Sequence, residues 1–251
     1  MINWREKFVA TAVHFAVTLV LAGIAAALIF LVWYPDPLQT LVGGTELFLL
    51  VVGVDLALGP LMSLVIFNSR KSRRQLLIDY AIVGVIQIAA LVYGVFVVAG
   101  ARPVYIAYYT DRYEVVTAFD IPPAELEAAK NTPYAALPWT GPKYVGVVVP
   151  KADQQDAMFK AIEGLEEHQR PKFFVPLSDK LETIRAKAGK IADLEARKPA
   201  SRPLIEAAIA GLDTPAERLA WLPVRHRMGF WTVFIDTADG KPVAWAELDP
   251  Y

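Results

Sequence analysis

The chain has 251 residues, of which 55% are hydrophobic, a formal net charge of −1 at pH 7 and no cysteine. Its hydrophobic content exceeds the roughly 45–50% of soluble globular domains, so at least part of the chain is not an ordinary soluble domain. The near-neutral charge argues against a nucleic-acid surface, and the absence of cysteine excludes disulfides and thiol chemistry.

Three long apolar runs lie within residues 1–100, at about 8–33, 47–67 and 77–99. Each reaches the roughly 20 residues that a helix needs to cross about 30 Å of hydrocarbon. One such run could be a buried helix of a soluble protein, but three in succession predict three transmembrane helices. The first run is too long for the apolar region of a signal peptide, and no small-residue cleavage site follows it. The aromatic pair Trp33 and Tyr34 at its end is typical of an anchor at the lipid–water boundary.

Basic residues predict the orientation in the membrane. The N-terminus and the link between the second and third runs are basic, through Arg5, Lys7, Arg70, Lys71, Arg73 and Arg74. The link between the first two runs, 34–46, has no lysine or arginine. The positive-inside rule therefore predicts a cytoplasmic N-terminus. Three crossings then place residues 101–251 on the far side of the membrane, which in a Gram-negative cell is the periplasm.

Residues 101–251 are expected to form one α+β domain with a small, mainly antiparallel sheet. Alternating aromatic and β-branched residues predict a hairpin of 104–109 and 113–119 around "TDR". "KYVGVVVP" and "KFFVPL" are predicted strands, and the alternating runs around "ADGK" (238–241) predict a closing hairpin.

Helices are predicted between these strands. "DIPPAELEAAKN" predicts a short helix, and 153–167 predicts another, in which Ala157, Ile162 and Leu165 lie at helical spacing. One long helix over 179–197 is expected to begin at a Ser178 cap, followed by a short helix over about 203–211 and a further helix opened by Thr214-Pro215.

Catalytic and metal-binding patterns are weak. No histidine has a second ligand at metal-binding spacing, and no nucleotide-binding or nucleophile motif occurs. Asp111 and Arg112 of "TDR" could form a catalytic pair, although a hairpin turn with an ion pair is the favoured interpretation. "EGLEEH" (163–168) is interpreted as a solvated helix end and "RHR" (225–227) as a solvated loop rather than an anion site. No enzyme, cofactor or metal is predicted.

The second apolar run, "GVDLALGPLMSLVIF" (53–67), contains an aspartate. A carboxylate near the middle of a transmembrane helix costs about 2.5–3.5 kcal/mol on insertion scales, so Asp55 needs an explanation. At 1.5 Å per residue, Asp55 lies about 18 Å from the cytoplasmic end of its helix, and Gln87 and Thr18 lie at about 15 Å. These three side chains can therefore meet in one layer. His14, at about 9 Å, is a poorer partner.

Two interpretations of Asp55 remain open. It can be protonated and bonded to Gln87 inside the bundle, or it can meet a polar group on another protein's membrane helix. Pro60 frees the carbonyl of Leu56, and Gly59 allows close backbone approach. Both features suit a docking groove as well as internal packing. Proton relay is a third option, for which one isolated acid is weak support.

Several stretches resemble the type IV pilin accessory proteins, the family known as TfpX/TfpZ or pilin high-affinity accessory proteins. They are "YPDPL" (34–38), "GVDLALGPLMSLVIF" (53–67), "YGVFVVAGARPVYIAYYTDRYEVV" (93–116) and the closing hairpin with "LDPY". The residues matched by position are Asp55, Leu56, Gly59, Pro60, Arg102, Pro103, Asp111 and Arg112. The family assigns them no catalytic role. With Gln87 they are the candidate partner-binding residues.

The resemblance implies a non-enzymatic, chaperone-like protein of the inner membrane. It would bind a cognate major pilin, by the pilin's membrane helix and periplasmic head, and promote its assembly into surface pili. The lipid bilayer and other inner-membrane components of pilus assembly are further expected partners. A periplasmic sensor domain acting through a partner is the alternative, although the cytoplasmic segments are too short for an output domain. A membrane enzyme acting on lipid or envelope polymer would depend on Arg102, Asp111 and Arg112.

Overall fold

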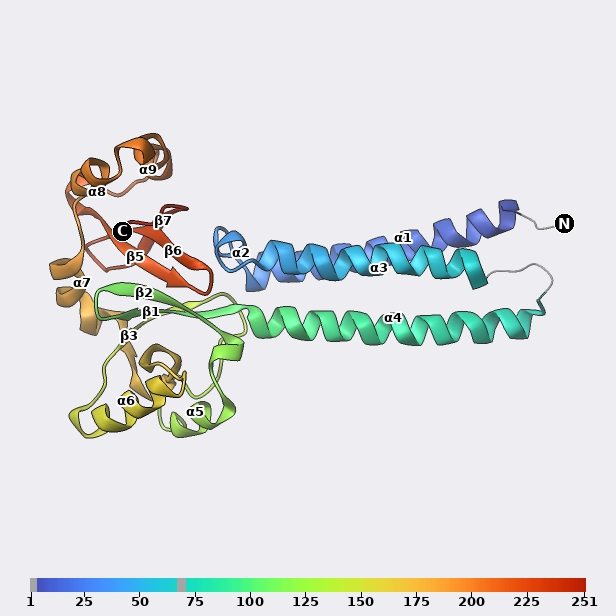
Figure 1. The fold of residues 1–251 in the computed structure, drawn as a ribbon, viewed down its shortest axis with the longest axis horizontal. Helices are drawn as coiled ribbons and strands as arrows, with labels where there is room; N and C mark the ends of the chain where they lie inside the picture. Colours follow the sequence, from blue (N-terminus) through green and yellow to red (C-terminus); the bar gives the residue numbers. More distant parts are fainter. Residues whose placement is uncertain (1–3, 67–70) are drawn as a thin grey trace. The chain divides into compact units, whose positions relative to one another are not determined.

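The computed structural model describes residues 4–66 and 71–251 and divides into two compact units, Met1–Gly100 and Ala101–Tyr251 (Figure 1). Phe67, expected at the end of the second span, and Arg70 of the basic link lie outside the described residues. The first unit is helical, and the second combines helices with a sheet.

Three segments of the first unit are long and apolar enough to span a membrane: Arg5–Trp33, Gly44–Ile66 and Arg73–Ala101. They correspond to α1 (Trp4–Leu28) with a following π-helical turn (Ile29–Trp33), α3 (Gly44–Ile66) and α4 (Arg73–Ala101), and the short α2 (Leu38–Leu41) precedes α3. Large apolar side chains are exposed along all three long helices. Helices that are apolar on every side suit a lipid environment, so the prediction of three membrane helices is confirmed at this level.

The aromatic pair at the end of α1 does not face outward. Trp33 and Tyr34 are 3% and 0% exposed and pack against Phe48 and Val98. The Tyr34 hydroxyl donates to the carbonyl of Val98 (2.7 Å), near the end of α4. The expected lipid anchor at this pair is therefore wrong, because the tyrosine joins α1 to α4.

The second unit contains one seven-stranded sheet in the order β4-β3-β1-β2-β5-β6-β7. Its strands are β1 (Pro103–Tyr109), β2 (Arg112–Thr117), β3 (Lys143–Val147), β4 (Phe174–Pro176), β5 (Leu219–His226), β6 (Gly229–Asp236) and β7 (Pro242–Ala246). The hairpins β1–β2 and β6–β7 confirm both sequence predictions. The first turns at Thr110, which has φ of 60°, and Gly240 in the second has φ of 75°.

The sheet is mixed, which corrects the prediction of a mainly antiparallel one. β1 pairs with β3, and β2 with β5, in parallel, whereas the remaining neighbours are antiparallel. Parallel neighbours require crossover connections. The first runs through α5 (Pro123–Ala128), and the second through the helices between β4 and β5.

The parallel partner of β2 replaces a predicted helix. After Thr214-Pro215 only a single 3₁₀ turn forms, Ala216–Arg218, and β5 then begins at Leu219. Pro223 within this segment is atypical of a central strand because it cannot donate a hydrogen bond. The pairing of β2 with β5 includes only Val224 and Arg225, so no donor is required of Pro223 on that side.

The predicted long helix over 179–197 is two helices, α7 (Leu181–Lys187) and α8 (Ile191–Arg197), and Ser178 does not cap it. Between them Gly189 and Trp221 exchange two backbone hydrogen bonds of 2.9 Å. A Cβ on Gly189 would lie 2.4 Å from the Trp221 indole nitrogen, so this bridge requires glycine. The bridge to β5 therefore interrupts a helix that its apolar periodicity alone would continue.

The remaining helices are α6 (Gln154–Ile162) and α9 (Arg202–Ile209). Two apolar clusters stabilise the second unit, one around Tyr105 and Phe174 and the other around Leu194 and Phe234. Burial raises the pKa of Tyr105 and of Tyr108 to about 12. The two hydroxyls donate to backbone carbonyls, that of Tyr105 to Ala136 and that of Tyr108 to Thr183.

Candidate functional site

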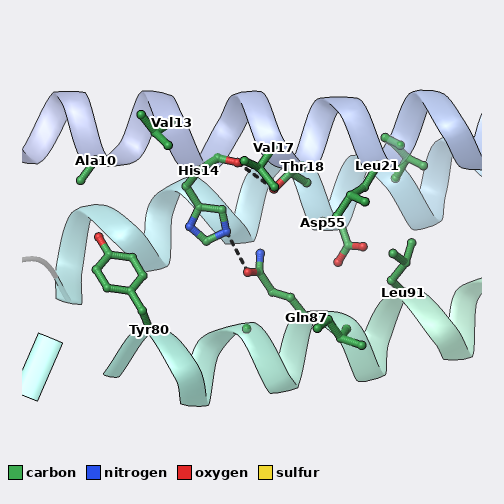
Figure 2. Close-up of a pocket in the computed structure, with 14 residues that line it drawn as sticks. Ala10, Val13, His14, Val17, Thr18, Leu21, Asp55, Tyr80, Gln87 and Leu91 are labelled. Carbon is green, nitrogen blue, oxygen red and sulfur yellow. Dashed lines mark hydrogen bonds between the residues drawn. The ribbon is translucent and has the colours of Figure 1, made fainter. Parts of the chain in front are cut away.

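A partly open cavity of about 570 Å³ lies between the three long helices (Figure 2). Its walls come from α1, α3 and α4 and are mostly apolar. Its polar lining residues are His14, Thr18, Asp55, Tyr80 and Gln87. Asp55, Gln87 and Thr18, which the sequence predicts to lie at one level, therefore all line this cavity. His14, which was expected to lie below that level, lines it as well.

Hydrogen bonding in this layer differs from the expectation. The Nε2 atom of His14 donates to Oε1 of Gln87 over 2.8 Å, and the hydroxyl of Thr18 donates to the carbonyl of His14 over 3.1 Å. Heights counted along each helix place only the backbone, and the side chains of His14 and Gln87 reach each other across the difference in height. Gln87 consequently bonds α1 rather than the aspartate of α3.

The carboxylate of Asp55 points into the cavity (Figure 2). Within residues 4–66 and 71–251 it has no hydrogen-bond or ion-pair partner. An ionised carboxylate only accepts hydrogen bonds, and burying one without a donor is costly in a membrane. Asp55 is therefore available to a group from outside this chain, and the internal pair with Gln87 does not form.

Gly59 and Pro60 follow this carboxylate about one turn further along α3. A Cβ on Gly59 would lie 2.3 Å from Nε2 of Gln87 and 3.3 Å from Nε2 of His14, so glycine lets the bonded pair lie against α3. Pro60 lies inside α3 and cannot bond the carbonyl of Leu56. Of the matched residues in the second apolar run, Gly59 therefore lies against the His14–Gln87 bond.

Other contacts join α3 and α4 on either side of the cavity. Toward the basic link, the hydroxyls of Ser63 and Tyr80 share a hydrogen bond of 2.8 Å. Toward the other end, Gly94 lies so close to Val51 that a Cβ would come within 2.3 Å of a valine methyl. The serine and tyrosine are polar interruptions of their apolar runs, which is the signal that could have identified this contact.

The second unit contains a charged cluster at the start of β2. Arg112 Nε donates to Glu114 over 2.8 Å, and Arg225 Nε donates to the other oxygen of Glu114 over 2.7 Å. Asp111 forms an ion pair with Arg112 (3.3 Å) in the hairpin turn, as the favoured interpretation of "TDR" has it. Glu114 is only 2% exposed and satisfied by both arginines, so the cluster stabilises the sheet.

Two charged segments that were interpreted as solvated belong to this cluster. Arg225 lies in β5 and also donates to Glu166, and His168 is 6% exposed beside that glutamate. Burial lowers the pKa of His168, and the nearby carboxylates of Glu114 and Glu166 oppose this only in part. The interpretations of "RHR" as a loop and of "EGLEEH" as a solvated end are wrong at these positions, because β2 and β5 pair side by side.

Arg102 and Pro103 lie at the opposite end of β1 from the Asp111–Arg112 turn. Pro103 pairs with Thr117 at the beginning of the strand. From Pro103 to Tyr109 the strand advances six residues at about 3.3 Å each, so the turn lies about 20 Å from Pro103. The motif residues Arg102, Asp111 and Arg112 therefore do not form one catalytic pocket. No group of three or more potential metal ligands occurs in the part of the chain that is described.

Helix α6 presents apolar side chains to the outside. Met158, Phe159 and Ile162 are 54%, 53% and 77% exposed, whereas Ala157 is buried. The helix predicted over 153–167 ends at Ile162, so Leu165 lies outside it. Grouped exposed apolar side chains of this kind are typical of contact surfaces.

These features define a membrane protein of three apolar helices, with a mostly apolar cavity between them that contains a few polar side chains, joined to a C-terminal α+β domain. Comparison with known proteins identifies the group. The chain is 31% identical over 228 residues to the fimbrial assembly protein of Dichelobacter nodosus serogroup I, covering 89% of this chain and 88% of that protein. The serogroup E1 protein gives the same identity and coverage. The chain belongs to this family of fimbrial assembly proteins.

Two further findings agree. The protein of serogroups C1 and C2 is 36% identical over 117 residues, which cover 47% of this chain and 89% of that protein. The family model described as Fimbrial assembly protein FimB matches residues 2–43. No solved structure matches. The matches support the fimbrial assembly family and do not single out the TfpX/TfpZ group.

Proposed function

We propose that this protein is a non-enzymatic accessory protein of the bacterial inner membrane that binds a type IV major pilin and promotes its assembly into surface pili. The family supports a role in pilus assembly. The observation that carries the binding proposal is the carboxylate of Asp55, directed into a cavity between membrane helices without a partner among the described residues. The N-terminus lies in the cytoplasm and the C-terminal domain in the periplasm, in accord with the basic link.

The pilin's membrane helix lies against the open side of the cavity and places a polar group inside it. A carboxylate in an apolar cavity attracts a donor or cation, so the occupant must offer an amine, amide or hydroxyl at this depth. Packing against the apolar side chains that line the cavity adds van der Waals contact, which drives helix association where no hydrophobic effect operates. The His14–Gln87 bond supplies a second polar contact.

The C-terminal domain contacts the pilin's globular head. Two weak contacts on one partner reinforce each other, because the first raises the effective concentration for the second. The exposed apolar side chains of α6 offer a surface for this contact. Exchanging residues 104–251 between two family members tests the assignment: pilin preference should follow the exchanged domain, and an unchanged preference would refute it.

The decisive experiment compares surface pili and membrane pilin in a deletion strain, with and without a plasmid copy. We expect normal membrane pilin, few surface pili and restoration by the wild-type gene. An Asp55→Asn copy should restore poorly at a normal protein level, whereas Leu58→Ala, at a 54% exposed position on α3, should restore fully. Unchanged surface pili in the deletion strain would refute the proposal, and altered pilin expression would favour the sensor alternative.

A further inference from the structure

Two large aromatic side chains of the C-terminal domain are exposed beside its first residues. Trp139 is 65% exposed and Phe119 is 56% exposed. They come from different segments, one following β2 and the other preceding β3. A lone exposed aromatic needs no explanation, but two beside one arginine form a surface with a definite chemistry.

Both aromatic residues are tied to Arg102, which directly follows α4. The amide of Ala118 donates to the carbonyl of Arg102 over 3.0 Å. Phe119 is the next residue after Ala118 and therefore lies near Arg102. The Arg102 guanidinium donates to the carbonyl of Pro138 over 3.3 Å and lies 5.9 Å from the centre of the Trp139 ring. Three segments of the domain therefore meet at the residue where the chain leaves α4.

The length of α4 places this point in the lipid head groups. Arg73–Ala101 has 29 residues, which at 1.5 Å each extend about 43 Å. A bilayer measures about 30 Å across its hydrocarbon and about 40–45 Å with its head groups. The end of α4 therefore reaches the head-group layer, and Arg102, the next residue, lies in that layer.

The chemistry of the surface fits this layer. Tryptophan is enriched at the membrane interface because its ring is apolar and its N–H polar, and the arginine fork pairs with phosphate. The aromatic pair expected there from the sequence, Trp33 and Tyr34, is buried.

We propose that Arg102, Phe119 and Trp139 form a lipid-binding face that seats the C-terminal domain on the phospholipid head groups. The two aromatic rings enter the interface, and the guanidinium pairs with a lipid phosphate. This contact limits the tilt of the domain and thereby holds its partner-binding surface at a fixed height above the membrane. It does not depend on the pilin proposal.

The absence of cysteine allows a direct test on the full-length protein in liposomes of phosphatidylethanolamine and phosphatidylglycerol. A fluorophore on Thr140→Cys, exposed and adjacent to Trp139, reports on the face with all three of its residues intact. A label on Ala238→Cys, in the β6–β7 turn, is the control. Thr117 pairs with Pro103 and so marks the end of the sheet next to Arg102. The strand registers place Asp236, where the β6–β7 turn begins, nine residues along the strands from the level of Thr117, a distance of about 30 Å.

Lipids with a nitroxide on the head group should quench the label at position 140 and leave the label at position 238 unquenched. Loss of quenching is expected in the variant Phe119→Ser/Trp139→Ser. The matched variant Met158→Ser/Phe159→Ser, at similarly exposed positions on α6, should retain it. Absence of quenching at position 140, or equal quenching at both labels, would overturn the proposal. Quenching that persists in the double serine variant would overturn the role of the aromatic rings.

Discussion

The close approach of α4 to α3 at Gly94 makes a quantitative prediction for Gly94→Ala. The added Cβ would lie 2.3 Å from a methyl of Val51, more than 1 Å inside the ordinary contact distance of about 3.5–4.0 Å. Valine in a helix strongly prefers one rotamer, so the methyl cannot simply turn away. The helices must separate or the valine must adopt a strained conformation.

The cost follows from comparison with Gly53→Ala on α3, where a Cβ meets nothing within 4 Å. Both substitutions gain the same helix propensity, so their difference isolates the clash. Overpacking costs about 1–3 kcal/mol. Gly94→Ala should therefore destabilise the contact between α3 and α4 by that amount relative to the control, which corresponds to an opening equilibrium constant about 5-fold to 160-fold larger.

Thiol alkylation measures this opening in the full-length protein in detergent. Val98→Cys introduces the chain's single thiol at a position on α4 that is 1% exposed. Its alkylation rate should rise with Gly94→Ala and stay constant with Gly53→Ala. Val51→Ala removes the clashing methyls and should reverse much of the effect of Gly94→Ala. Equal rates for the two glycine variants would refute the reasoning.

Three further predictions concern the charged cluster, its histidine and the cavity. Glu114→Gln leaves two arginines facing one neutral side chain and should lower the free energy of unfolding of the domain by about 2 kcal/mol. The cost is smaller than for breaking a fully buried ion pair because both arginines are partly exposed. Urea unfolding measures it, and Glu127→Gln, at an exposed ion pair, is the control that should change nothing. The pKa of His168 is lower folded than unfolded, so the unfolded state binds more protons and stability should fall as the pH drops below about 6.5. His168→Gln should flatten this slope in melting curves between pH 5 and pH 7, and an unchanged slope would exclude the histidine as its source. Gly84→Leu projects into the cavity from a position with nothing within 4 Å and should abolish surface pili at a normal protein level. Gly53→Leu, on α3 outside the cavity lining, should not, and equal pili in both would argue against an occupied cavity.

Patterns that depend on near neighbours were readable from the sequence. The three apolar spans follow from run length, and the hairpins β1–β2 and β6–β7 from alternation around turn residues. The ion pair of Asp111 and Arg112 follows in the same way from two adjacent residues in a turn.

Features that depend on distant segments were not readable. β5 carries a proline and resembles no central strand, but β6 pairs with it over its whole length. The break between α7 and α8 exists because Gly189 meets Trp221, 32 positions away. Likewise Glu114 and Arg225 form a cluster only because β2 and β5 are parallel neighbours.

The candidate site shows the same division. The sequence by itself determined that a carboxylate, an amide and small residues share one level of the membrane helices, because helical rise per residue sets depth. Only the tertiary structure decided that Gln87 bonds His14 and that Asp55 points into a cavity, since these outcomes depend on how each helix is rotated and packed. Rotation is set by contacts between segments far apart in the chain, such as Tyr34 with Val98 and Val51 with Gly94.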